Sequence, residues 1–404
     1  MVHDWRCGAG EISPLAALGR NDNARLRLYC QKSETGTRFI IGNLQEDKQM
    51  SIKCEVWGKS PDGKDVHKFT MTNAMGASVS VIEWGAICTS IIVPDAGGNM
   101  DDVALGFDSL EKYLGPHGCF GDTVGRYGNR IGAGKFSIDG KEYQVALNDH
   151  GVNHLHGGNV GFAAHFWDGT AKEEEYQDSV SFHRISPDGE ENYPGNLDVT
   201  VTYTWNDMCD LNIRYEATTD KPTLCNLTNH TYFNLGGHKH GTVKDHVVTI
   251  DADVVTKVDK GLIPTGEYMA VVDTPLDLRD GLLVEEGLEV MDTCPQMIPA
   301  GGYDHNFVLR KGEAMGAAAS VWHEESGRYM EVLTDQPAIQ FYTACTLNAK
   351  GGKEGMDYGK FSGFCLETQH CPDDPNHSNF PGTTILRPGE KYDTTTIYAF
   401  RADE

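Results

Sequence analysis

The chain has 404 residues, of which 34 are basic and 59 acidic, so its formal net charge at pH 7 is −25. Phosphate backbones and anionic membrane surfaces repel such a chain, so neither nucleic acid nor a membrane is an expected partner. No run of 18 apolar residues indicates a transmembrane helix. The 11 cysteines are odd in number and form no CxxC pair. They are interpreted as free thiols of a protein in the reducing cytoplasm.

Two parts of the chain differ in composition. Residues 1–50 carry mixed charges with little alternation, and they are predicted to form an N-terminal extension that is disordered or loosely attached. Residues 51–404 are predicted to form one domain, because no later change in composition marks a second one. Leu282–Met291 is the best candidate for a helix.

Short β-rich runs recur throughout the chain. In chain order they are Arg38–Ile41, Ala77–Trp84, Ile87–Val93, Gly134–Ile138, Glu142–Val145, Leu197–Trp205, Leu211–Ala217, Val247–Ile250, Ala338–Tyr342 and Thr395–Phe400. Asp139-Gly140 is typical of a two-residue hairpin turn between two of them. Frequent strands with few helices predict an all-β fold, a large single-domain antiparallel β-sandwich with few short helices.

Asn226–Leu235 and Gly363–Gln369 combine strand periodicity with chemically useful side chains. With a period of two, Leu227, Phe233 and Leu235 share one face of the first run, and His230 lies on the other. In the second run, Glu367 faces away from Leu366. A histidine and a glutamate on strands with one apolar face are the parts of a general acid/base pair. Either residue alone is more often structural or solvated than catalytic.

Three further motifs place polar side chains beside glycines. Gly125–Ile131 contains Asn129 and Arg130, Asn153–Gly158 contains His154 and His156, and Gly301–Phe307 contains Asp304. Glycines allow the backbone to approach a ligand closely, and these side chains offer hydrogen-bond donors and acceptors in number. Together they form a set suited to binding the hydroxyl groups of a sugar.

These motifs resemble those of the aldose 1-epimerase (galactose mutarotase) family. The resemblance extends from about Lys53 to the segment Leu386–Asp393. It implies a large one-domain β-sandwich that interconverts the α and β anomers of free hexoses, galactose and glucose, without cofactor or metal. By the same resemblance, His230 is the general acid, Glu367 is the general base, and the residues that hold the sugar are Asn129, Arg130, His156 and Asp304. Gly128, where relatives commonly carry alanine, and the N-terminal extension depart from the family pattern.

Other functions are weighed against this one. A glycoside hydrolase would use Asp304 and Glu367 as its two carboxylates, and a non-catalytic carbohydrate-binding module would need no acid/base pair. A hexose-6-phosphate 1-epimerase would require a basic cluster, and only Arg126 and Arg130 lie near the motifs. No GxGxxG follows a strand and opens a helix, which argues against a nicotinamide-dependent epimerase.

No metal site is expected, because His150, His154 and His156 match no common zinc spacing and His323-Glu-Glu lacks the second histidine of HExxH. The expected partner is a monosaccharide, and a monomer is the default expectation, since the sequence does not reveal the oligomeric state.

Overall fold

The computed structural model describes residues 28–33, 36–41 and 50–402, and the chain divides into two units, Met1–Gln49 and Met50–Glu404. In the first unit, β1 (Leu28–Ser33) and β2 (Gly36–Ile41) pair antiparallel, and the predicted strand Arg38–Ile41 lies within β2. The rest of the predicted extension lies outside the described residues, so its loose attachment stays a prediction.

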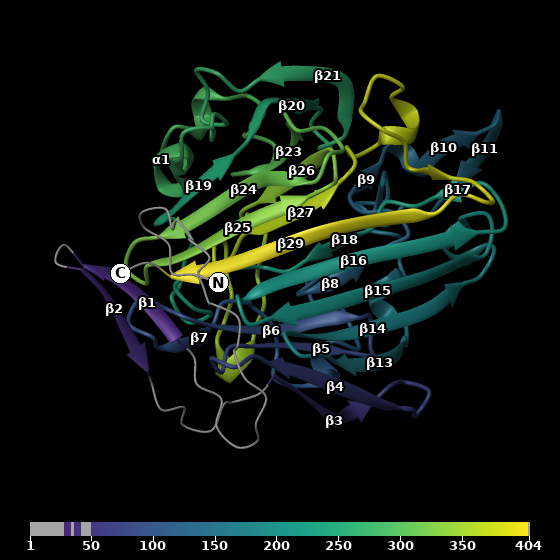
Figure 1. Cartoon of the computed structure of the whole chain (residues 1–404). Coiled ribbons are helices and arrows are strands. Elements are labelled where there is room, and N and C mark those ends of the chain that lie inside the picture. The colour runs from purple at the N-terminus through teal and green to yellow at the C-terminus, as the bar shows by residue number, and fades with distance from the viewer. Residues whose placement is uncertain (1–27, 34–35, 42–49, 403–404) are drawn as a thin grey trace, which may run out of the picture. The chain divides into compact units, whose positions relative to one another are not determined.

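The second unit is built around a nine-stranded antiparallel sheet, seen at the front of Figure 1. Its strands, in spatial order, are β13 (Asp168–Glu173), β14 (Gln177–Ser186), β15 (Leu197–Asn206), β16 (Asp210–Thr219), β29 (Tyr392–Ala402), β25 (Arg328–Thr334), β24 (Gly316–His323), β19 (His246–Ile250) and β22 (Leu282–Leu283). In β15 every second residue, from Leu197 to Trp205, is buried, which is the pattern of a sheet with one face on the core.

Two five-stranded antiparallel sheets complete the sandwich. One contains β3 (Ser51–Lys59), β4 (Asp65–Thr72), β5 (Ser78–Ile82), β6 (Ile87–Pro94) and β7 (Met100–Asp102). The other contains, in spatial order, β21 (Pro264–Ala270), β20 (Ala252–Val258), β23 (Asp304–Leu309), β26 (Ala338–Tyr342) and β27 (Cys365–Gln369).

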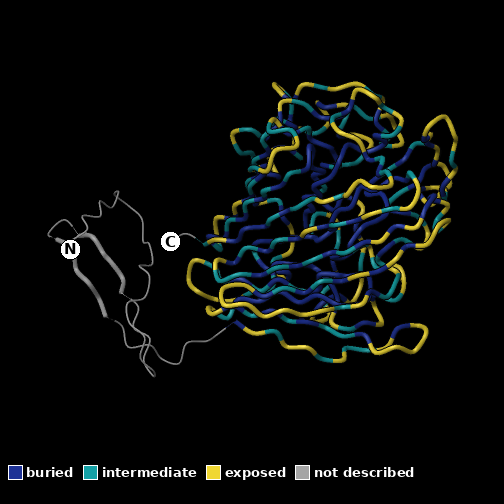
Figure 2. The backbone as a smooth tube through the Cα atoms, turned by 45° about the vertical axis from the view of Figure 1, so that its right-hand side comes forward, coloured by how far each residue is buried: buried dark blue, intermediate teal, exposed yellow. Residues whose placement is uncertain are grey.

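One hydrophobic core joins the three large sheets. Val201 of the nine-stranded sheet, Val79 of β5 and Phe341 of β26 belong to the same buried cluster, and Tyr398 of β29 donates a hydrogen bond to the carbonyl oxygen of Leu366 in β27, at 2.8 Å. Figure 2 shows the buried residues running through the interior of this unit and the exposed ones at its loops. Burying each large apolar side chain stabilises the fold by about 1.5–3 kcal/mol. The packed core therefore fixes the positions of the polar side chains on the other face of β23, β26 and β27, the face that points away from this core.

Four short antiparallel strand pairs accompany the three sheets. They are β8 (Asp122–Val124) with β18 (Thr228–His230), β9 (Arg130–Ile131) with β12 (His154–Leu155), β10 (Lys135–Ile138) with β11 (Lys141–Gln144), and β17 (Thr223–Leu224) with β28 (Ile385–Leu386). Within the described residues the one α-helix is α1 (Val284–Glu289), inside the predicted Leu282–Met291. The 3₁₀ turns are Leu110–Lys112, Gly132–Gly134, Phe162–Ala164, Glu190–Asn192, Met291–Thr293, Lys353–Gly355 and Asp374–Asn376.

The predicted all-β sandwich is therefore confirmed. The predicted strands after residue 70 all occur, with ends that differ by a few residues from those expected. The Asp139-Gly140 turn joins β10 to β11, with φ of 52° at Asp139 and 78° at Gly140, as a two-residue hairpin turn requires. No helix in the described part of the chain is long and apolar enough to cross a membrane.

Candidate active site

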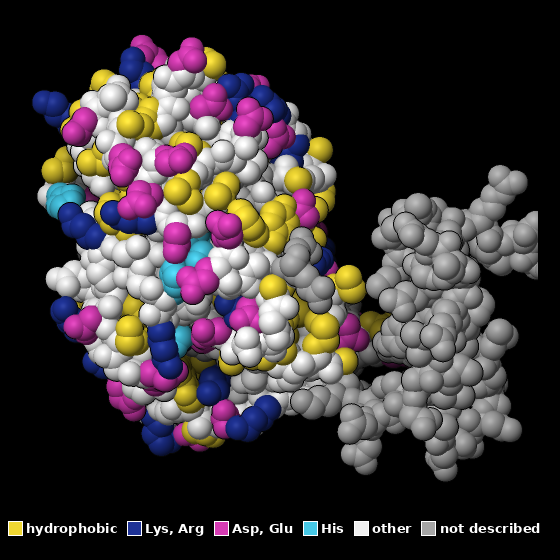
Figure 3. Space-filling model, turned by 90° about the vertical axis from the view of Figure 1, so that its left-hand side faces the viewer, with side chains coloured by type: hydrophobic (Ala, Val, Ile, Leu, Met, Phe, Trp, Pro, Cys, Tyr) yellow, Lys and Arg dark blue, Asp and Glu magenta, His cyan; other side chains and the backbone are white. Residues whose placement is uncertain are grey.

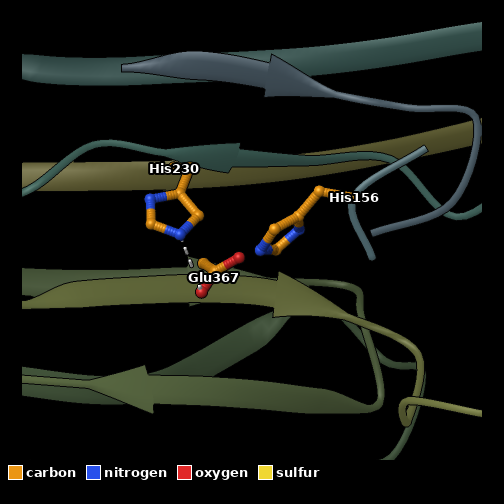
Figure 4. A group of neighbouring side chains, drawn as sticks. All are labelled: His156, His230 and Glu367. Atoms are coloured by element: carbon orange, nitrogen blue, oxygen red, sulfur yellow. Dashed lines mark ion pairs between the residues drawn. The ribbon is translucent and has the colours of Figure 1, made fainter. Parts of the chain in front are cut away.

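His230 reaches the site from β18. The predicted strand Asn226–Leu235 is shorter in the structure: only Thr228–His230 forms a ladder, with β8, and Phe233 makes isolated bridges to Ala104 and Phe364. The division of faces nevertheless holds, because Leu227, Phe233 and Leu235 lie in the main core. The His230 side chain, on the opposite face, is turned towards β27 (Figure 4).

Glu367 lies in the middle of β27 and faces His230. Its neighbour Leu366 is in the main core, so the strand presents an apolar face and a polar face as predicted. The Nε2 atom of His230 is 3.8 Å from Oε1 of Glu367, and both residues are almost fully buried, with 4% and 2% of their surfaces exposed (Figure 4). The two strands thus bring an imidazole and a carboxylate that are 137 positions apart in the sequence next to each other.

The surroundings of Glu367 favour a proton acceptor with useful basicity. Burial raises the pKa of its carboxyl above the ordinary 4.5, and the negative charge of Asp304 acts in the same direction, while His230 and Arg130 oppose the rise. Oε2 of Glu367 is buried and has no hydrogen-bond partner within the described residues. A buried carboxylate oxygen without a partner is costly to the protein alone, and a ligand hydroxyl would satisfy it.

His156 and Asn129 hold each other in place. The backbone N–H of Asn129 donates to Nδ1 of His156 at 3.2 Å, and the N–H of His156 donates to the carbonyl oxygen of Asn129 at 3.1 Å. Both residues have left-handed backbones, with φ of 64° and 50°. Gly157 follows with φ of 84°, and a Cβ there would lie 1.7 Å from the carbonyl oxygen of Gly125, so only glycine fits.

The His156 ring lies beside the acid/base pair. Its centroid is 5.2 Å from that of His230, nearly perpendicular to it, and Figure 4 shows its ring directed towards Glu367. Burial first, and the nearby charges of His230 and Arg130 second, hold the pKa of His156 well below 6.5. His156 is therefore a neutral imidazole at physiological pH.

Arg130 and Asp304 form a charged rim next to this pair. The guanidinium of Arg130 donates from Nε to Oδ2 of Asp149 at 3.1 Å, and its Nη1 lies 3.7 Å from Oδ2 of Asp304. Both side chains are 14% exposed, so they can meet a ligand at the mouth of the site. All six residues expected at the site thus lie in one region, as the contacts above and the charge of Arg130 and Asp304 at Glu367 indicate.

Gln340 is a polar residue of the same region that the sequence does not single out. It stands directly opposite Glu367 in the β26–β27 register, and its Nε2 donates to Oδ1 of Asp304 at 2.6 Å. Its own Oε1 is buried without a hydrogen-bond partner among the described residues. In Ala338–Tyr342 the alternation of an isolated polar residue with Ile339 and Phe341 is the only signal, and it does not reveal what Gln340 faces.

The donor atoms of His156, His230 and Glu367 lie within 4.8 Å of one another. Two imidazoles and a carboxylate can hold a metal or transfer protons. Here the buried, partnerless carboxylate next to an imidazole, rimmed by further hydrogen-bonding groups, suits proton transfer on a polyhydroxylated ligand.

Comparison with known proteins points to one family. The sequence profile described as aldose 1-epimerase matches residues 67–399. Over 352 residues the chain is 45% identical to human galactose mutarotase, and the alignment covers 87% of this chain and 98% of the relative. It is 35% identical to the aldose 1-epimerase of Escherichia coli over 346 residues, 85% of this chain and 98% of the relative.

Solved structures agree with the sequence comparison. The GalM/aldose epimerase homologue from C. elegans superposes with a TM-score of 0.74 at 31% identity, covering 82% of this chain and 98% of that one. Galactose 1-epimerase from Lactobacillus acidophilus gives a TM-score of 0.76 at 28% identity, covering 88% of this chain and all of that one, 100%. The chain therefore belongs to the aldose 1-epimerase family.

Proposed function

We propose that this protein is an isomerase that interconverts the α and β anomers of free hexoses, with Glu367 as the base and His230 as the acid. The observation that carries the proposal is the buried approach of His230 Nε2 to Glu367 Oε1, at 3.8 Å, from two different sheets. Family membership and relatives named galactose mutarotase and aldose 1-epimerase support it.

The reaction needs one proton taken and one given. Glu367 removes the proton of the C1 hydroxyl while His230 protonates the ring oxygen, so the C1–O5 bond breaks and an open-chain aldehyde forms. The aldehyde rotates about C1–C2, and the ring closes by the same transfers in reverse. Each positioned proton transfer contributes roughly 10²–10⁴-fold to the rate. Atoms and charge balance without a redox step.

The remaining site residues bind the sugar hydroxyls. Asp304 accepts hydrogen bonds, Arg130 and Asn129 donate them, and His156 donates from the ring nitrogen that its Nδ1 contact leaves free. Gln340 joins them, because its Oε1 is a buried acceptor with no described protein partner. Since bound hydroxyls would satisfy these atoms, the orphaned groups support a polyhydroxylated substrate.

A phosphorylated hexose is a poorer fit. Arg126, one of the two arginines near the motifs, is 2% exposed and is occupied by Ser186 Oγ at 2.8 Å and by the carbonyl oxygens of Ser186 and Pro187. The charge of Arg130 is already balanced by Asp149 and Asp304, at 3.1 Å and 3.7 Å. Among the described residues near the motifs, neither arginine therefore offers an unbalanced positive charge to a phosphate dianion, although Arg130 can still donate hydrogen bonds to neutral hydroxyls.

We further propose that the enzyme acts as a cytoplasmic monomer. All nine cysteines within residues 50–402 are free thiols, and seven of them are buried, as expected of a protein from a reducing compartment. Size-exclusion chromatography with light scattering tests the monomer, with a dimer mass contradicting it.

Polarimetry of freshly dissolved α-D-galactose tests the function. The purified protein is expected to speed the approach to anomeric equilibrium far above the buffer rate, and to release no product from methyl galactosides. Failure to accelerate mutarotation of galactose and glucose would overturn the proposal. Acceleration with galactose 6-phosphate or glucose 6-phosphate alone would favour the phosphosugar epimerase, and binding without turnover would favour a sugar-binding module.

A further inference from the structure

A second group of histidines gathers around a carboxylate outside the active site. His240, Asp245 and His323, here called the β19 cluster, lie where β24 ends and β19 begins. Because His246 stands opposite His323 in the β19–β24 register, the two strands bring residues nearly eighty positions apart into contact. Figure 3 views this end of the nine-stranded sheet and shows histidine side chains among acidic ones near the middle of the face.

The three donor atoms of the β19 cluster converge on one point. The Nε2 atom of His240 is 2.6 Å from Oδ2 of Asp245, and that of His323 is 3.4 Å from the same oxygen. All three lie within 4.8 Å of one another. Ligand atoms around a tetrahedral zinc ion, at ~2.0–2.2 Å from it, are separated by roughly 3.4 Å. Small side-chain rotations would bring this set to that geometry.

His246 fixes the carboxylate from behind. The backbone N–H of Leu235 donates to Nε2 of His246 at 2.9 Å, so the ring's hydrogen is on Nδ1, which contacts Oδ1 of Asp245 at 2.9 Å. One oxygen of Asp245 is thereby engaged, and the other is directed at His240 and His323. An outer histidine that orients a ligating carboxylate is a common feature of metal sites.

His323 is the most telling member of the cluster. It is 2% exposed, yet its Nε2 forms no hydrogen bond with any described residue. Its Nδ1 accepts a hydrogen bond from the backbone N–H of Ser326 at 3.4 Å and lies 2.8 Å from Oγ of the same residue. The ring hydrogen is therefore on Nε2, which lies 3.4 Å from Oδ2 of Asp245 and forms no good hydrogen bond with it. A shift of that hydrogen to Nδ1, where Oγ of Ser326 can accept it, would free the Nε2 lone pair for a cation.

The exposure of the β19 cluster also suits a cation. The side chains of Asp245 and His240 are 50% and 20% exposed, which leaves a path for an ion and a position for water as the fourth ligand.

We propose that the β19 cluster is a binding site for a divalent transition-metal ion of the zinc type, held by Nε2 of His240, Nε2 of His323 and Oδ2 of Asp245. Two imidazoles and one carboxylate prefer zinc and its neighbours in the first transition row over magnesium or calcium. The ion joins the loop after Leu235 to the edge of the large sheet. It is a structural site, independent of the proposed sugar chemistry.

From its position, the ion would stabilise the loop that follows Leu235. Leu235 ends the segment that carries His230, and it is held by His246, Ser326 and Arg328 through its backbone N–H and carbonyl oxygen. Fixing His240 and His323 to Asp245 would tighten the loop that leaves this segment. The expected result is a more stable fold.

Metal titration of the full-length protein in reducing buffer tests the site. Zn²⁺ is expected to bind with one equivalent by calorimetry and to raise Tm by about 2–4 °C or more. Co²⁺ is expected to give the visible bands of a tetrahedral site without the charge-transfer bands of thiolate ligands. The variants His240→Ala and His323→Gln should each weaken Zn²⁺ binding by about 100-fold or more, and His246→Gln by about 10–100-fold.

Matched variants separate this site from other ligands. His183 and Asp198 form an exposed histidine–carboxylate pair at 2.8 Å on β14 and β15, and His183→Ala should leave Zn²⁺ binding unchanged. Glu367→Gln should do the same, since it alters only the active-site group. Undiminished binding in both His240→Ala and His323→Gln, loss of binding in Glu367→Gln, or no binding by the wild type would each overturn the proposal, while circular dichroism verifies that the variants are folded.

Discussion

Two clusters of this fold contain the same residue types, two histidines and one carboxylate, yet the burial of the carboxylate differs. Glu367 in the active site is 2% exposed, and burial raises its pKa. The side chain of Asp245 is 50% exposed, and its hydrogen bonds to His246 and His240 outweigh the effect of burial and lower its pKa. The same residue types thus have opposite shifts of the carboxyl pKa in the two environments, which agrees with the base proposed for one cluster and the metal ligand proposed for the other.

The pKa of a carboxyl group, and with it the chemistry that the group can perform, depends on its burial and on the hydrogen bonds that it accepts, and not on the residue type alone. A buried carboxylate with one unpaired oxygen takes up a proton more readily than an exposed one. A half-exposed carboxylate that accepts hydrogen bonds from histidines favours the ionised form. The expected effects of the following changes run from large to small.

Glu367→Gln should break the active-site cluster most severely. The amide keeps the shape of the side chain but cannot take the C1 hydroxyl proton, so kcat for galactose mutarotation should fall by about 10²–10⁴-fold. Sugar binding, measured by calorimetry, should persist. Asp198→Asn, in an exposed histidine–carboxylate pair, is the control and should leave kcat unchanged. Equal loss of binding and turnover in Glu367→Gln would assign it a structural role.

Asp304→Asn should affect binding more than turnover. Asp304 offers a charged acceptor at the rim of the site, and a hydrogen bond to a charged group contributes about 1.5–3 kcal/mol. Its loss should lower kcat/KM by roughly 10–100-fold, chiefly through KM, in initial-rate polarimetry. A fall in kcat with KM unchanged would instead indicate that Asp304 acts on the reacting atoms.

The pH dependence should report the raised pKa of Glu367. Only the ionised carboxylate accepts a proton, so kcat/KM should fall as the pH drops through a pKa above the ordinary 4.5. For stability the sign is opposite. A folded-state pKa above the unfolded value means that Glu367 favours the folded state at low pH and that this contribution is lost as the pH rises.

Glu367→Gln should therefore be at least as stable as the wild type at pH 7, by thermal unfolding. A variant much less stable than the wild type at neutral pH would show that the ionised carboxylate stabilises the folded state and does not destabilise it.

Removing residues 1–49 should have the smallest effect. Both clusters lie in the unit Met50–Glu404, whose first residue is buried in the main core. A protein that starts at Met50 should keep mutarotation activity and Zn²⁺ binding within about twofold, since terminal segments are often dispensable. An insoluble or unfolded protein would show that the N-terminal part is needed for folding.

Local pattern predicts much of this fold. The Asp139-Gly140 hairpin and the alternation of Leu197–Trp205 are properties of neighbouring residues, and both occur as expected. The length of the strand around His230 was not predictable. Its residues remain buried beyond Thr228–His230, but their backbone partners, such as Ala104 and Phe364, come from distant segments that no local period reveals.

The same limit applies to the sites. His230, Glu367, Asn129, Arg130, His156 and Asp304 stand in motifs that resemble a known family, and the structure places them in one region. Gln340 lies at the active site because it is paired with Glu367 in the β26–β27 register. His323 lies in the β19 cluster because it is paired with His246 in the β19–β24 register. Strand register depends on the packing of whole sheets, so residues that meet across it carry no spacing signal.

The hydrogen bond from the Asn129 backbone to Nδ1 of His156 has a consequence for ligand selection. With Nδ1 occupied as an acceptor and the ring neutral, the remaining nitrogen presents a permanent N–H to the ligand. A hydroxyl or ether oxygen can accept that hydrogen, but an ammonium group has no lone pair to offer. Amino sugars that place a charged nitrogen at this point should therefore be excluded, and the main chain, which mutation of side chains does not alter, enforces that choice.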